Sequence, residues 1–475
     1  MRITAAIVIA CALTASAIGQ TPVARPLLIV APDALKAALD PYAAFKKTIR
    51  PVRIVGLETI LASTPGVDDP EKLKRYLYDE WRKRRIGYVL LVGDRDVMPI
   101  RFMTTMKFKT FDYLFLPTDL YYADLARDDG SFDDWNGNKS SYHNTYFAEV
   151  NGEKGRPLNA DGIHYRPQIA VGRWPVSTPE AVRVIADKSI AYETSILNGT
   201  HPGLRTAAMF HVDGWIDARE DLSRMARSLP PGWKAERFLY QDGNRAFRTP
   251  APTAAAVTSA FNRGVGLLLH VGHGETDSWI DFPASTTVGS KTHLNAVLST
   301  WHGLSEIKNA GWLPVVISIG CSTAYFAPLG PNEPYIDVTG KAHAGEAKKE
   351  HFAGPPPAPS PYQPGKLGKD SLGKQLLENG PDGAAVYIGS DMVAQPMGLH
   401  LLDGFVTGMR TSRTPTVGDS WSFAVRHYYD AAKLAHLATD GDWVVPATFS
   451  QAMKFNVFGD PSLPLAAQTA GSRGR

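Results

Sequence analysis

The feature that most constrains the fold is a series of short, strongly apolar runs that recurs along the chain with helical segments between them. In the first part of the chain these runs occupy residues 27–31, 52–57 and 88–94. Apolar runs of this length are typical of parallel strands, which are buried on both faces of a sheet. Between the last two runs, Asp69 is predicted as a helix N-cap and Pro70 as the first helical residue. The pattern therefore predicts βαβ units and a parallel sheet covered by helices.

A second series of apolar runs follows a polar region at residues 117–165, which is rich in Asp, Asn, Gly and Tyr. That region shows little periodicity and is expected to be a long loop that ends at a strand within residues 166–176. We expect an α/β fold with two αβα units, each containing a mainly parallel sheet. The later apolar runs lie at residues 207–213, 265–274, 313–321 and 383–391.

The boundary between the two units is expected near residue 176. The first unit is assigned to residues 20–176 and the second to residues 177–467. Within the second unit, residues 327–370 are rich in Pro and Gly, so they are predicted to be an insertion without regular structure. Residues 468–475 are expected to form a disordered tail.

The amino terminus has the features of a secretory signal peptide, which we assign to residues 1–19. Arg2 precedes an apolar run and then small residues, and cleavage is expected after Ala17 or Gly19. The mature protein is thus expected to be secreted, periplasmic or at the cell surface. A lipoprotein modified on Cys11 is the alternative, although only ten residues precede that cysteine. No later apolar run approaches the ~20 residues that a membrane-spanning helix needs.

Charge and cysteine content narrow the classes of function. A formal net charge of +3 over 475 residues gives no electrostatic case for binding nucleic acid or an anionic membrane. Of the two cysteines, Cys11 lies in the expected signal peptide, so Cys321 would be alone after export and no disulfide could form within the mature chain. A single thiol of this kind is either buried and inert or reactive, and its neighbourhood decides between the two.

Two apolar runs of the second unit end in residues capable of nucleophilic chemistry. LLLHVGHG delivers His273 and Gly274, and VVISIG delivers Cys321. The carboxyl ends of parallel strands lie along one edge of a sheet, so neighbouring strands would bring His273 and Cys321 together. The imidazole would support the thiolate and protonate the departing amine, and the Gly274 N–H would help to bind an oxyanion. His270 would point to the opposite face and is expected to be a hydrogen-bonded core residue.

These residues stand in a sequence that resembles the gingipain-type cysteine peptidases. The signature of that family is His-Gly after one apolar strand and Cys after the next, with a Trp soon after the His-Gly, and GHGETDSW places Trp279 there. YVLLVGDRDVMP, PTDLYYADL, IAVGRWPV and VFGDPSLPL are similar to other landmarks of the family, so the resemblance covers about residues 27–465.

The resemblance implies that the second unit is caspase-like and catalytic. It implies a cysteine endopeptidase that cleaves proteins or peptides through a Cys321–His273 dyad and a thioester acyl-enzyme, without a catalytic cofactor. It carries over Gly274 as an oxyanion contributor and suggests Trp279 as a substrate-binding residue. The insertion at residues 327–370 has no counterpart in the family pattern and would act as an autoinhibitory lid or a processing site. The oligomeric state is left open.

Gingipain-type peptidases bind calcium as a structural ion, and the run DLARDDGSFDDWNGN at residues 124–138 supplies the oxygen donors that calcium prefers. The spacing does not match an EF-hand, so a solvated acidic loop is the alternative. The candidate ligands are Asp119, Asp124, Asp128 and Asp133, with further donors at Asp129, Asp134, Asn136 and Asn138.

Arginine-cleaving gingipains use an acidic residue after an early strand of the catalytic subdomain. HVDGWID offers Asp213 and Asp217 as substrate-binding residues in that region, and a carboxylate there would favour a basic side chain. The alternative is that either residue caps a helix that begins after Trp215. The residues around Cys321 differ from those around the gingipain nucleophile, so a preference for basic residues is a hypothesis.

Two other functions stay open from the sequence. A transpeptidase would pass the acyl group to an amine instead of water, and a catalytically idle relative would be a calcium-stabilised binding or secretion component. An idle scaffold has no need of Cys321, His273, Gly274 and Trp279 together, so their presence favours the peptidase.

Overall fold

The computed structural model describes residues 24–105, 114–137, 147–241, 247–281, 296–300, 302–365, 370–412, 414–439 and 441–466. The expected signal peptide and the expected C-terminal tail both lie outside the described residues. Within these ranges, no helix has the length and apolar character needed to cross a membrane.

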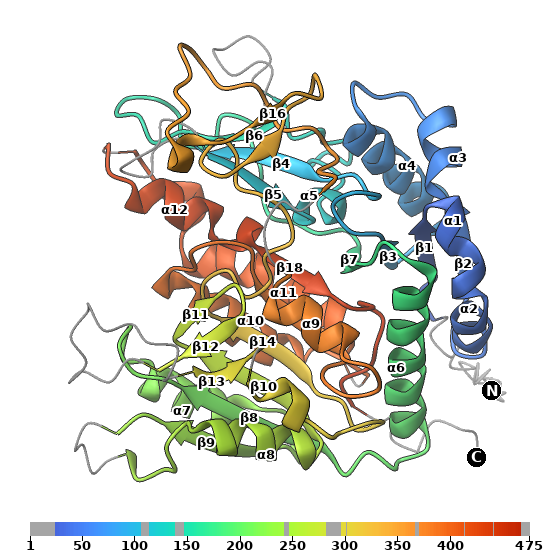
Figure 1. Ribbon diagram of the computed structural model, residues 1–475, viewed down its shortest axis with the longest axis vertical. Helices are drawn as coiled ribbons and strands as arrows, with labels where there is room; N and C mark the ends of the chain where they lie inside the picture. Colours follow the sequence, from blue (N-terminus) through green and yellow to red (C-terminus); the bar gives the residue numbers. More distant parts are fainter. Residues whose placement is uncertain are drawn as a thin grey trace, which may run out of the picture.

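A ten-stranded sheet runs through the described part of the molecule in the order β2-β1-β3-β7-β18-β17-β14-β10-β8-β9 (Figure 1). Neighbouring strands are parallel throughout, except that β18 is antiparallel to β17. The expected α/β fold with mainly parallel strands is therefore confirmed. The strands are β1 (Leu27–Ala31), β2 (Val52–Gly56), β3 (Tyr88–Val92), β7 (Ala170–Trp174), β8 (Gly203–His211), β9 (Lys234–Leu239), β10 (Val265–Val271), β14 (Val315–Ile319), β17 (Val386–Ser390) and β18 (Phe455–Phe458).

The two expected units share this one sheet. Strand β7, from the first unit, pairs in parallel with β18, from the far end of the second, through Arg173 and Phe458. The helix α6 (Pro179–Leu197) then packs against helices of both halves, and Figure 1 shows it running along one side of the molecule. The boundary near residue 176 falls in the turn between β7 and α6.

Helices fill the connections between the strands, as the alternating pattern predicts. The helix expected after residue 69 is α4 (Asp69–Arg84), but its N-cap is Asp68, whose carboxylate accepts a hydrogen bond from Glu71 N at 3.0 Å. Asp69 is instead the first helical residue, so the expected cap was wrong by one position. The other α-helices are α1 (Asp33–Lys36), α2 (Asp40–Lys47), α3 (Leu57–Ser63), α5 (Leu120–Ala123), α7 (Arg219–Ser228), α8 (Ala254–Asn262), α9 (Leu372–Glu378), α10 (Leu399–Gly408), α11 (Val417–Ala431) and α12 (Val444–Ser450).

The polar region at residues 117–165 is more ordered than a long loop. It contributes to a small sheet in the order β5-β4-β6, formed by β4 (Arg101–Thr105), β5 (Leu114–Thr118) and β6 (Phe147–Val150). Tyr121 and Trp135 are fully buried beside this sheet. The aromatic residues scattered among the acidic ones therefore build a core, which the missing periodicity concealed.

The Pro-rich insertion lies against this small sheet, where Figure 1 shows it in orange. It contains a short ribbon of β15 (Tyr335–Ile336) and β16 (Ala342–His343). The insertion is tied to the first unit, because Ile100 N donates to Pro361 O at 3.0 Å and Gln363 N donates to Arg95 O at 2.7 Å.

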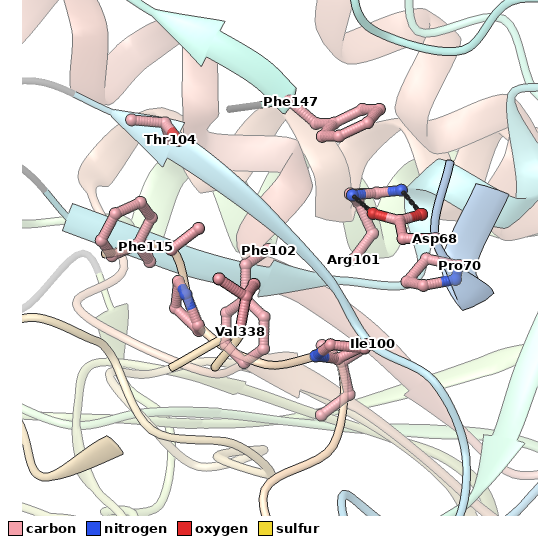
Figure 2. Close-up of a pocket in the computed structure, with 12 residues that line it drawn as sticks. Asp68, Pro70, Ile100, Arg101, Phe102, Thr104, Phe115, Phe147 and Val338 are labelled. Atoms are coloured by element: carbon pink, nitrogen blue, oxygen red, sulfur yellow. Dashed lines mark hydrogen bonds and ion pairs between the residues drawn. The ribbon is translucent and has the colours of Figure 1, made fainter. Parts of the chain in front are cut away.

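A cavity of about 80 Å³ remains between the insertion and the small sheet. Phenylalanine side chains and Val338 line it, and the ion pair of Arg101 with Asp68 closes one end (Figure 2). Ligand pockets have volumes of about 300–1,000 Å³, so this cavity is too small for a peptide.

Candidate active site

The strands that lead to His273 and Cys321 are direct neighbours. Strands β10 and β14 pair in parallel, with Val271 opposite Ile319. His273 and Cys321 each lie two residues beyond this pair, at the carboxyl edge of the sheet. The placement expected from the sequence is therefore the one observed.

The two loops that carry these residues touch through Gly274. This glycine lies in β11 (His273–Glu275), which forms a small sheet with β12 (Ser278–Ile280) and β13 (Ala296–Ser299). A Cβ atom at Gly274 would lie 2.6 Å from Thr323 Cγ2, 2.9 Å from Cys321 O and 3.1 Å from Cys321 N. The backbone after His273 thus packs directly on the backbone of Cys321, in a space that admits no side chain.

The His273 ring is oriented by a backbone carbonyl. Its Nε2 lies 2.7 Å from the oxygen of Gly214, in the loop after β8. A carbonyl oxygen only accepts hydrogen bonds, so Nε2 carries a proton. In the neutral imidazole, Nδ1 is then the basic nitrogen. The role of Gly214 leaves no signal in the sequence, because the hydrogen bond uses its backbone oxygen and does not depend on the residue type.

Cys321 is a partly exposed cysteine at a tight turn. Its thiol lies 3.9 Å from Ala394 O. The next residue, Ser322, has a left-handed backbone with φ of 57°, and its N–H donates to Met392 O at 2.8 Å. The turn ends β14 abruptly and leaves Cys321 at the sheet edge, as a nucleophile requires.

Behind the two loops lies a buried layer of aromatic and polar side chains. The His270 ring stacks on Trp279 with centroids 4.3 Å apart, and His270 Nδ1 lies 2.9 Å from Ser318 Oγ. Burial lowers the pKa of His270 well below its ordinary value. The expectation that His270 is a hydrogen-bonded core residue is confirmed.

Trp279, suggested as a substrate-binding residue, is fully buried in that layer. Its Nε1 donates to Tyr387 OH at 3.1 Å. A side chain without exposed surface cannot contact a substrate in this arrangement, so the structure gives Trp279 a packing role beneath the loops.

The two candidate specificity carboxylates differ in their surroundings. Asp217 accepts two hydrogen bonds from the Arg219 guanidinium, at 2.7 and 2.8 Å, and one from Arg219 N at the start of α7. These bonds lower the pKa of Asp217. The N-cap of α7 is Ala218, so Asp217 precedes the helix as the ion-pair partner of Arg219 and is not its capping residue. Asp213 lies next to Gly214 and donates from its backbone N to Asp281 Oδ1 at 2.8 Å. Asp213 is therefore adjacent in the chain to Gly214, whose carbonyl oxygen orients the His273 ring.

The four expected calcium ligands do not converge. Asp119 forms a buried two-point ion pair with Arg173, at 2.7 Å for both bonds, and the Asp128 side chain is exposed. Asp124 and Asp133 are buried near the ammonium group of Lys74. Within the described ranges, no group of three or more His, Cys, Asp or Glu side chains could hold a metal ion, and Asn138 lies outside those ranges.

At the place where the sequence suggested a bound calcium ion, the structure has the positively charged side chain of Lys74. Its Nζ lies 4.0 Å from the centroid of the Tyr121 ring. Burial lowers the pKa of Lys74 to about 8, while Asp133 and Asp124 act in the opposite direction. As placed, these aspartates do not fit a calcium site, and structural calcium stays a prediction without support from their geometry.

Comparisons with known proteins agree with this fold. The family model "Peptidase family C25" matches residues 21–466. The crystal structure of the Arg-specific cysteine proteinase gingipain R (RgpB) is similar, with a TM-score of 0.57, 14% identity and coverage of 94% of this chain and 81% of that chain. The complex of Porphyromonas gingivalis RgpB pro- and mature domains gives a TM-score of 0.56, 14% identity and coverage of 93% and 79%.

At these identities the structural matches establish the shared fold. No curated protein matches the chain in sequence. The family model, however, spans most of the chain and includes both loops of the candidate site. The chain therefore belongs to peptidase family C25, a family of cysteine peptidases that act on protein substrates.

Proposed function

We propose that this C25 family member is an exported cysteine endopeptidase, with Cys321 as nucleophile and His273 as general base and acid. The observation that carries the proposal is the packing of Gly274 on the Cys321 backbone, which fixes the two loops together at the carboxyl edge of a parallel sheet. Export rests on the signal peptide expected at residues 1–19.

The reaction uses Nδ1 of His273, which is the basic nitrogen when Nε2 donates to Gly214 O. Nδ1 takes the thiol proton, and the sulfur forms a bond to the peptide carbonyl carbon while the carbonyl π electrons move to oxygen. Backbone N–H groups of the two loops, including that of Gly274, would bind the resulting oxyanion. As the C–N bond breaks, the imidazolium gives its proton to the departing amine. Water, deprotonated by His273, then hydrolyses the thioester and frees Cys321.

Asp213 is the better candidate for selecting a basic residue in the substrate. Both carboxylates accept hydrogen bonds within the chain, but Asp213 immediately precedes Gly214, whose carbonyl oxygen orients His273. A preference for Lys or Arg before the cleaved bond would follow from a carboxylate in this place.

The proposal is tested by the cleavage of a denatured protein mixture, with mass spectrometry of the products. Activity is expected to fall by at least about 10³-fold in Cys321→Ala and in His273→Ala, because each removes a partner of the dyad. Alkylation of the thiol should abolish activity and EDTA should not. The product profile also reports the preferred residue.

His351→Ala, at an exposed histidine in the insertion, provides the matched control and should keep full activity. Full activity in Cys321→Ala would disprove the mechanism. Transfer of the acyl group to an added amine in preference to water would instead identify a transpeptidase.

A further inference from the structure

The loop that follows β17 lies directly against the nucleophile. The Cys321 thiol contacts Ala394 O at 3.9 Å, and Ser322 N donates to Met392 O at 2.8 Å. This loop therefore fixes the position of the sulfur from the side of β17.

A buried lysine holds the same loop from beneath. Lys454, immediately before β18, is 0% exposed, and its Nζ donates to Val393 O at 3.1 Å and Gln451 Oε1 at 3.3 Å. Its own carbonyl accepts a hydrogen bond from Asp391 N at 2.9 Å. Lys454 and Cys321 thus bind the carbonyls of consecutive residues, Val393 and Ala394, in one short loop.

The charged groups that act on the Lys454 ammonium are Asp391 and Cys321. Burial lowers the pKa of Lys454 to about 8, and negative charge on Asp391 or Cys321 opposes this effect. Asp391 is also fully buried, and burial raises its pKa well above the ordinary value despite Lys454 and Asn456. The Cys321 thiolate is thus an anion that, together with Asp391, stabilises the ammonium group of Lys454 in this poorly solvated place.

We propose that Lys454 is a positioning residue that stabilises the thiolate form of Cys321 while it fixes the loop against the sulfur. The inference rests on the proposed function, since it concerns the same nucleophile. In this arrangement the ammonium group of Lys454 stabilises the thiolate before the substrate binds, whereas His273 exchanges protons during the reaction. A low thiol pKa is what makes a cysteine reactive near neutral pH.

The test is the rate of alkylation of Cys321 by iodoacetamide as a function of pH, in a Cys11→Ser background where Cys321 is the one thiol. Lys454→Met keeps the length and apolar stem of the side chain and removes its charge. The midpoint of the rate profile should rise by about one pH unit, which reduces the thiolate fraction about tenfold below the midpoint.

Lys188→Met is the matched control. Lys188 is also buried and also bound to backbone carbonyls at 2.6–2.8 Å, but these belong to Leu376 and Leu377 in α9 and to Asp382 before β17. Its substitution should leave the midpoint unchanged. An unchanged midpoint in Lys454→Met, or an equal rise in both variants, overturns the inference.

A reciprocal measurement keeps the lysine in place. The pKa of Lys454, followed by NMR of its side chain, should fall in Cys321→Ser because the balancing thiolate is gone, and an unchanged pKa would overturn the inference. Alkylation does not require turnover, so an inactive chain with a shifted midpoint would refute the proposed function alone. An active chain with an unshifted midpoint would refute only the role of Lys454.

Discussion

At the scale of single residues, Gly274 is the position where a small change should have the largest effect on the candidate site. A methyl group there meets the Cys321 backbone, which cannot move without distorting β14. We expect Gly274→Ala to push the His273 loop away from Cys321 and to lower kcat/KM by about 10²-fold, the usual consequence of a displacement near 1 Å. Steady-state kinetics on a peptide identified from the product profile would measure it.

Gly354→Ala is the matched control, since a Cβ atom at Gly354 meets nothing within 4 Å. This variant should retain the activity of the unaltered chain. Equal activity in Gly274→Ala would show that the two loops need not touch, and would remove the main support for the dyad.

The sequence predicted the residues at this site that lie at the ends of strongly apolar strands. His273 and Cys321 follow β10 and β14, whose complete burial makes them recognisable as neighbours in a parallel sheet. Gly214 acts through its carbonyl, and Lys454 comes from a distant part of the chain. Neither has a sequence signal, because each acquires its position from tertiary packing.

At the scale of elements, a buried histidine holds parts of the insertion together by hydrogen bonds to two carboxylates. His343 Nε2 lies 2.9 Å from Asp337 Oδ2, and its Nδ1 lies 2.8 Å from Glu350 Oε1. Burial disfavours the imidazolium, but the hydrogen bonds to Asp337 and Glu350 outweigh it and raise the pKa of His343. Hydrogen bonds from His343 lower the pKa of Glu350, and those from Thr339 and His343 lower the pKa of Asp337 against the effect of burial.

These pKa shifts predict that the hydrogen bonds of His343 stabilise the insertion less at alkaline pH. A raised histidine pKa gives stability that is complete below its unfolded value of about 6.5 and is lost as pH rises through the folded value. The lowered carboxyl pKa values give stability that is lost only as pH falls below about 4. Limited proteolysis within residues 327–365, in the Cys321→Ala background, should therefore be faster at pH 8.5 than at pH 5.5.

His343→Gln should remove this pH dependence, because glutamine carries no charge at either pH. His351→Gln, at an exposed position of the same insertion, should preserve it. Equal cleavage rates at both pH values for the Cys321→Ala chain with His343 intact would show that the histidine does not hold the insertion in place.

At the scale of the whole molecule, a buried lysine joins the two halves of the chain. Lys46 in α2 lies 2.6 Å from Glu193 in α6 and 3.1 Å from Asp460 just after β18, and all three side chains are nearly or fully inaccessible to solvent. Lys46→Met would leave two buried carboxylates without their cation. The free energy of unfolding should fall by about 3–5 kcal/mol, measured by denaturant titration with tryptophan fluorescence.

Lys47→Met, at the exposed neighbouring position, serves as the control and should change stability by less than about 0.5 kcal/mol. If the two variants were equally stable, the Lys46 cluster would not be holding the halves together.

The alternating pattern predicted the strands of each half but not the way in which the halves join. Short apolar runs identify parallel strands locally, whereas the contact of Arg173 with Phe458 is a pairing between distant segments. The small β5-β4-β6 sheet was missed for a different reason, since its buried aromatic residues lie among aspartates and glycines without a regular period.

The position of β18 between β7 and β17 has a consequence for the order of events during biosynthesis. The ribosome completes β7 first, then the turn that bears Cys321 and strand β17, and only later β18, which pairs with β7 on one side and with β17 on the other. Until β18 arrives, β7 and β17 each present an unpaired edge, and the Cys321 loop lacks the lysine beneath it. A chain that ends before residue 454 therefore has Cys321 without the lysine beneath its loop, so the candidate site is complete only once β18 has joined the sheet.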